Sequence, residues 1–92
     1  MTTETVRVRV VVTGRVQGVY FRQSTAAEAQ AAGVAGCVRN LADGRVEAVF
    51  EGSRAAVETM LGHIARGPEH ARVDSVETVW ETPEGAEGFA IR

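Results

Sequence analysis

The sequence predicts an α+β fold of the ferredoxin-like split βαβ type, a sandwich in which two helices cover one face of an antiparallel sheet. Its 92 residues, 45% hydrophobic and 24% charged, suit one globular domain. Segments in which apolar and polar residues alternate, as in strands, and segments typical of helices follow one another in the order β-α-β-β-α-β, with a short strand after them. We therefore expect the sheet order 4-1-3-2, with residues 6–92 forming a single domain.

The first third of the chain is expected to form a strand, a loop and a helix. Residues 1–5 are polar and are expected to fray. Valine at every second position of residues 6–12 predicts a strand, and two glycines in residues 13–18 predict a loop. Residues 19–32 hold neither Pro nor Gly and predict a helix, which Gly33 would end.

A hairpin is expected next. Residues 34–41 and 45–51 predict two strands, and Asp43-Gly44 between them is a strong hairpin signal. In the second of these strands, alternation puts three apolar side chains on one face and three charged ones on the other. The apolar set is Val46, Ala48 and Phe50, and the charged set is Arg45, Glu47 and Glu51.

A second helix and two strands complete the expected order. Ser53 can cap a helix that Gly67-Pro68 would close. Alternating residues at 76–80 predict the fourth strand, and residues 89–91 predict the terminal one. Apolar side chains recur along one face of the helix, at Val57, Met60, Leu61, Ile64 and Ala65.

The charged residues exclude several classes of function. Ten basic and twelve acidic residues give a net charge of −2, which offers no broad attraction to nucleic acid or to an anionic membrane. All ten basic residues are Arg, so mechanisms that need a Lys nucleophile or Schiff base are excluded. Cys37 is the single cysteine and cannot form an internal disulfide or a Cys-x-x-Cys site. We expect a cytoplasmic protein with no membrane partner.

The loop between the first strand and the first helix is a candidate anion site. Gly14 and Gly18 can take positive φ, which lets the backbone between them curl and aim successive N–H groups at one point. The following helix adds its unpaired N–H groups and the positive end of its dipole. Arg22 falls in the first turn of that helix, where a cation is unfavourable unless an anion binds beside it. A plain strand-to-helix turn with a solvated Arg22 is the alternative.

Asn40 is the second candidate. It lies at the end of the second predicted strand, within reach of the same loop in this fold. A carboxamide both donates and accepts hydrogen bonds, so it can hold a water molecule near a phosphorus atom without titrating. Alternatively, Asn40 only starts the hairpin turn.

Together these segments resemble the acylphosphatases, small enzymes that hydrolyse the carboxyl-phosphate bond of acyl phosphates. The resemblance rests on G-R-V-Q-G-V-Y-F-R at residues 14–22, on G-C-V-R-N and D-G-R-V-E within residues 36–47, and on F-A-I-R at residues 89–92. Nine contiguous matching positions and a second motif at a suitable distance make it specific. Cys37 departs from the pattern of the family, because many members carry a bulkier residue at this position.

The resemblance implies a role for each candidate residue. Arg22 would bind the phosphoryl group, and Asn40 would orient the attacking water. The implied enzyme is a monomer that needs no metal or cofactor, acts on a small acyl phosphate, binds no nucleic acid, and is inhibited by inorganic phosphate or sulfate. The implied phosphate-binding residues are Arg15, Val16, Gln17, Gly18, Val19, Tyr20 and Arg22.

Some questions stay open at this point. Arg15 and Arg39 can either steer the anion or serve as ordinary surface residues. His63 and His70 are expected to face solvent, and Cys37 to be buried. An RNA-binding sheet would need paired aromatics that the central strands lack, and a metal chaperone would need Cys-x-x-Cys after the first strand. A module that binds phosphate without hydrolysing it is the alternative that the sequence distinguishes least well from an enzyme.

Overall fold

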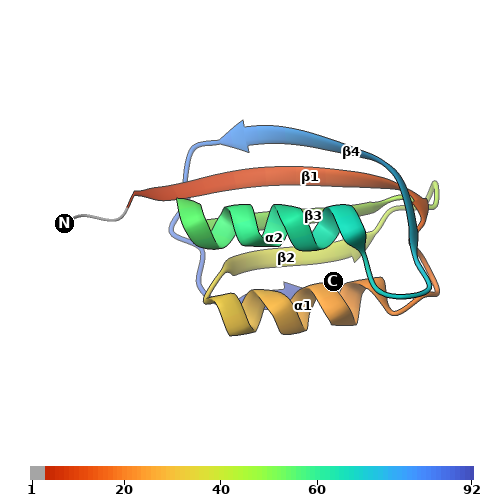
Figure 1. The fold of residues 1–92 in the computed structure, drawn as a ribbon. Coiled ribbons are helices and arrows are strands. Elements are labelled where there is room, and N and C mark those ends of the chain that lie inside the picture. Colours follow the sequence, from red (N-terminus) through yellow and green to blue (C-terminus); the bar gives the residue numbers. More distant parts are fainter. Residues whose placement is uncertain (1–3) are drawn as a thin grey trace.

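Two helices lie against one face of a five-stranded sheet in the computed structural model, which describes residues 4–92 (Figure 1). The predicted α+β class and element order are confirmed, and residues 1–3 of the segment expected to fray lie outside the described residues. Thr5 already pairs with Ser53 in the sheet. The elements are β1 (Thr5–Arg15), α1 (Phe21–Ala32), β2 (Ala35–Asn40), β3 (Val46–Ser53), α2 (Arg54–Arg66), β4 (Arg72–Glu81) and β5 (Phe89–Ile91).

The sheet is mixed, whereas a wholly antiparallel sheet was expected. Its order is β4-β1-β3-β2-β5, so the expected arrangement of the first four strands is correct. β5 pairs with β2 in parallel. The chain leaves β4 at one edge of the sheet and crosses to the opposite edge, so β5 runs opposite to β4 and parallel to β2 (Figure 1). Alternation identifies a strand but not the neighbour with which it pairs.

The core lies between the sheet and the helices. Val8, Val10 and Val12 of β1 are fully buried and form one cluster with apolar side chains of α2. The cap of α2 is as predicted, because the Ser53 hydroxyl accepts a hydrogen bond from the Ala56 N–H at 3.2 Å. Neither helix among residues 4–92 is long and apolar enough to span a membrane.

Helix α1 begins at Phe21, two residues later than the sequence predicts. Gly18 and Tyr20 have φ of 73° and 66°, in the left-handed region. A helix cannot pass through left-handed residues, so the backbone stays a loop as far as Tyr20. The absence of Pro and Gly after residue 18 therefore did not mark the start of the helix.

Glu51 lies on the sheet face away from the helices, as alternation predicts, but it is only 3% exposed. Its carboxylate accepts hydrogen bonds from the N–H groups of Glu84 at 2.9 Å and Ala86 at 2.8 Å. It also pairs with the Arg7 guanidinium at 3.0 Å. Glu51 thus holds the connection that carries the chain from β4 to β5.

Two further expectations need correction. His63 is half-buried between the helices, and its Nε2 lies 3.3 Å from the Ser24 hydroxyl. Burial lowers the pKa of His63. Cys37 is half-buried, because it projects from β2 toward the face that no helix covers. His70 is exposed as expected.

We predict that Glu51→Gln lowers the free energy of unfolding by about 2 kcal/mol at pH 7, because hydrogen bonds to a charged group contribute about 1.5 to 3 kcal/mol. The Glu84 N–H, more than any other donor, lowers the pKa of Glu51 below its ordinary value of 4.5. The charge therefore stabilises the fold above pH 4.5, and this stabilisation is lost as the pH falls through the folded-state pKa.

Urea unfolding of both proteins at pH 7 and in acid measures this effect. The difference between them should shrink in acid. The exposed Glu58→Gln on α2 is the control and should change the free energy by less than about 0.5 kcal/mol. An equal difference between Glu51→Gln and the original protein at both pH values would contradict the prediction.

Candidate active site

The loop that runs from Arg15, the last residue of β1, to Tyr20 is held in place by buried side chains. Val16 is 1% exposed and Val19 is 9% exposed, so both anchor the loop in the core. Gly18, which lies between these two valines, and Tyr20, which follows them, adopt left-handed conformations. Such alternation lets neighbouring N–H groups converge on one point, as in backbone nests that bind anions.

Gln17 joins this loop to the hairpin between β2 and β3. Its side-chain amide donates hydrogen bonds to the carbonyl oxygens of Leu41 at 2.8 Å and Arg45 at 3.0 Å. These carbonyls flank the turn that follows Asn40, and Leu41 N–H in turn donates to the Arg45 carbonyl. The loop and the end of β2 are therefore tied together across the end of the sheet.

A depression of about 180 Å³ lies where the loop, the start of α1 and the end of β2 meet. Asn40 lies two residues after Val38 in β2, so both side chains point to the same face of the sheet. The Val38 side chain is buried on the helix-covered face, and Asn40 reaches the depression from that face. The lining residues are Val16, Gly18, Tyr20, Phe21, Arg22, Gln23 and Asn40.

The depression brings together most of the residues proposed from sequence, but not all of them. Arg22 and Asn40 both line it. Arg15, Gln17 and Val19 do not, although they belong to the same loop. Conversely, Phe21 and Gln23 line it and were not proposed.

Arg22 brings a guanidinium that no Asp or Glu side chain neutralises within residues 4–92. Its Nη1 donates to the main-chain oxygen of Arg92 at 3.3 Å, and it forms no ion pair with an Asp or Glu side chain there. Arg39, by contrast, pairs with Glu47 at 2.9 Å. Arg22 therefore keeps its charge available to a ligand, whereas the charge of Arg39 is largely compensated.

The N-terminus of α1 adds free amides to this charge. Ser24 N–H makes the first hydrogen bond of the helix, to the Tyr20 carbonyl at 3.1 Å, so the N–H groups of residues 21–23 have no partner within the helix. No acidic residue lies in this first turn. The positive end of the helix dipole, these amides and Arg22 therefore favour an anion in the depression.

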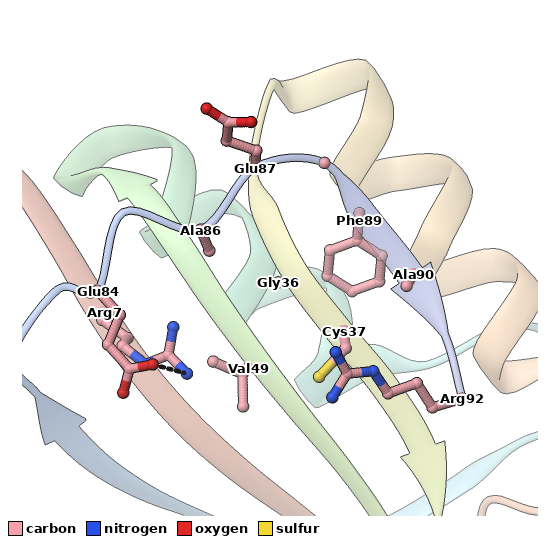
Figure 2. A pocket seen from close by; sticks show the side chains of 11 residues that line it. Arg7, Gly36, Cys37, Val49, Glu84, Ala86, Glu87, Phe89, Ala90 and Arg92 are labelled. Carbon is pink, nitrogen blue, oxygen red and sulfur yellow. Dashed lines mark ion pairs between the residues drawn. The ribbon is translucent and has the colours of Figure 1, made fainter.

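Two larger hollows lie on the other face of the sheet, where Arg7, Arg9 and Arg39 form ion pairs with Glu side chains and Arg92 forms none within residues 4–92. They measure about 540 and 460 Å³ and share Arg7, Cys37, Val49 and Arg92, and Figure 2 shows the first of them. Arg7 there is paired with Glu51 at 3.0 Å and Glu81 at 3.1 Å. Figure 2 also shows its ion pair with Glu84, so the charge of Arg7 is already matched by acidic side chains.

Neither the Gln17 side chain nor the main-chain oxygen of Arg92 was identified from sequence as a structural partner of the site. A glutamine in a loop carries no signal of which carbonyl groups it will meet, because those lie in a distant hairpin. The main-chain oxygen of Arg92 becomes a partner of Arg22 only because β5 pairs with β2. Among residues 4–92, no group of three or more His, Cys, Asp or Glu is arranged to hold a metal ion.

The family model and the curated relatives indicate one family. The acylphosphatase family model matches residues 8–91. The acylphosphatase of Natronomonas pharaonis is 54% identical over 87 residues, and that of Anaeromyxobacter dehalogenans is 58% identical over 88 residues, with 95% of each chain covered in both cases. The crystal structure of acylphosphatase from Bacillus subtilis matches with a TM-score of 0.91 at 34% identity, covering 95% of this chain and 98% of that one.

We predict that Gln17→Ala weakens the binding of inorganic phosphate about tenfold, because each lost hydrogen bond contributes about 0.5 to 1.5 kcal/mol to holding the loop. Isothermal titration calorimetry measures this affinity. Gln30→Ala, an exposed glutamine on α1 outside the depression, is the matched control and should bind phosphate normally. A folded Gln17→Ala protein with unchanged affinity would show that the loop holds its shape without this side chain.

Proposed function

The chain belongs to the acylphosphatase family, enzymes that hydrolyse acyl phosphates, and we propose that it does so with its 15–20 loop, Arg22 and Asn40. Water attacks the phosphorus atom and forms a new P–O bond. The bond from phosphorus to the acyl oxygen breaks, and its electron pair leaves with the carboxylate. The products are a carboxylate and inorganic phosphate, together with the proton released from water.

The loop amides and Arg22 bind the phosphoryl group in this proposal. In phosphoryl transfer, negative charge is spread over the equatorial and leaving oxygens, and catalysis consists mainly of positioning and charge stabilisation. A guanidinium can contact two oxygens at once, and amide N–H groups can take the others. The absence of an Asp or Glu side chain paired with Arg22 within residues 4–92 supports this role.

Asn40 orients the attacking water. An acyl phosphate has a good leaving group, since a carboxylate departs without needing a proton at neutral pH. The reaction therefore depends on placing water in line more than on a strong base. The carboxamide can accept a hydrogen bond from that water and so hold it near the phosphorus atom.

One observation carries the proposal: Arg22, Asn40 and the left-handed loop residues line the same depression. The loop and the start of α1 follow each other in the sequence, whereas Asn40 comes from the end of β2, a separate segment. A module that only binds phosphate would need Arg22 and the amides but not Asn40. The shared location of all three therefore favours hydrolysis over binding alone.

We also propose that the chain forms one domain from residue 6 to residue 92 and acts as a monomer in a reducing cytoplasm, without nucleic acid as a partner. The single Cys37 and the net charge of −2 support this. Inorganic phosphate or sulfate would compete with substrate at the depression. Light scattering of the purified protein measures the oligomeric state.

Arg22→Ala is expected to lower kcat for benzoyl phosphate by about 10² to 10³, because removing one preorganised donor to a transition-state charge costs about 2.7 to 4 kcal/mol. Arg22→Lys should restore little, since an ammonium lacks the planar fork. Steady-state kinetics measure both variants, with Arg66→Ala on the exposed side of α2 as the control that keeps its activity. Near-normal turnover by either Arg22 variant would reject the role given to Arg22.

Asn40→Ala is expected to lower kcat about tenfold or more, while the inhibition constant of inorganic phosphate changes less than about threefold. The reason is that Asn40 handles water and the anion is held elsewhere. Turnover and product inhibition measured on one preparation separate the two effects. Loss of phosphate inhibition with turnover retained would reverse the assignment.

A further inference from the structure

The depression can hold the phosphoryl group but not the whole of a bulky acyl group as well. At about 30 Å³ for each water molecule, its volume of about 180 Å³ equals roughly six waters. A phosphoryl group and one attacking water occupy part of that space. A bulky acyl group therefore extends past the rim, where it meets the side chains that stand there.

The direction in which it extends follows from the geometry of phosphoryl transfer. The attacking and leaving oxygens lie roughly in line on opposite sides of the phosphorus atom. With water held at Asn40, the acyl oxygen leaves on the side away from Asn40. All other residues that line the depression belong to the loop and to the first turn of α1, so the acyl group passes these.

Tyr20 and Gln23 are the side chains of this group that are free to meet an acyl group. Val16 and Phe21 are buried in the core, and Arg22 binds the phosphoryl group in the proposed mechanism. Gly18 has no side chain. Tyr20 is 68% exposed, the highest value among the exposed large hydrophobic residues, and it is the aromatic one of the pair.

Tyr20 also has an unfavourable backbone conformation. Its φ of 66° is the only positive φ of a non-glycine residue within residues 4–92. A bulky residue in this region is strained, and glycine or asparagine would adopt the conformation at lower cost. The exposed ring buries little surface in the fold, and glycine or asparagine would adopt this backbone more easily, so an aromatic side chain here is a departure of the kind typical of functional positions.

We infer that the ring of Tyr20 contacts the acyl group and makes the enzyme selective for acyl phosphates with an aromatic or planar acyl group. This inference rests on the proposed function and adds a specificity-determining residue to it. An aromatic ring prefers to stack against another planar group, and small aliphatic acyl groups offer much less contact.

The test compares two substrates, benzoyl phosphate and acetyl phosphate, by kcat/KM. In Tyr20→Asn the ratio of the two values should fall about threefold to tenfold, because the stacking contact is lost while asparagine tolerates the left-handed backbone. Tyr20→Phe keeps the ring and should keep the ratio within about twofold. The ratio cancels any effect that the substitution has on phosphoryl binding, which both substrates share.

Gln23→Ala is the matched control at the other exposed position of the rim, and its ratio should stay within about twofold of the original. An unchanged ratio in Tyr20→Asn, or an equal fall in Gln23→Ala, would overturn the inference. Circular dichroism checks that each variant is folded. If the original protein hydrolyses neither substrate, the proposed function fails, whereas hydrolysis of both with an unchanged ratio in Tyr20→Asn overturns only the role of Tyr20.

Discussion

The arrangement of the site depends on the side-chain amide of Gln17, which spans from the loop to the hairpin. The loop leaves β1 and the hairpin leaves β2, and these strands are not neighbours in the sheet, because β3 lies between them. Hydrogen bonds to Leu41 and Arg45 close this gap at 2.8 and 3.0 Å. They add to the backbone pairing through Val46 of β3, which pairs with Val12 of β1 and with Asn40 of β2.

A second chain of contacts links the other end of the molecule to the site. Glu51 holds the connection to β5 through the N–H groups of Glu84 and Ala86, and β5 then pairs with β2. The last step is the main-chain oxygen of Arg92, which accepts a hydrogen bond from Arg22 at 3.3 Å. A buried carboxylate on the open face of the sheet thus contributes to the orientation of a guanidinium at its edge.

Periodicity and turn signals predicted the elements and the capping of α2, because each of these depends on neighbouring residues. The β-α-β-β-α-β order of those elements then predicted the order of the first four strands. The sequence also pointed to Arg22 and Asn40, which line one depression. It could not predict the parallel pairing of β5, the burial of Glu51 or the partners of Gln17. Each of these depends on where a distant segment passes, and no local pattern records that.

The two glycines of the loop motif differ in what they would tolerate. At Gly14, with φ of 138°, an added Cβ would collide with the carbonyl oxygen of Arg72, next to the register shift between β1 and β4. At Gly18 nothing lies within 4 Å of such an atom, and only the φ of 73° disfavours other residues. Asparagine at Gly18 would therefore destabilise the fold only modestly, whereas a side chain at Gly14 would require the backbones of β1 and β4 to separate.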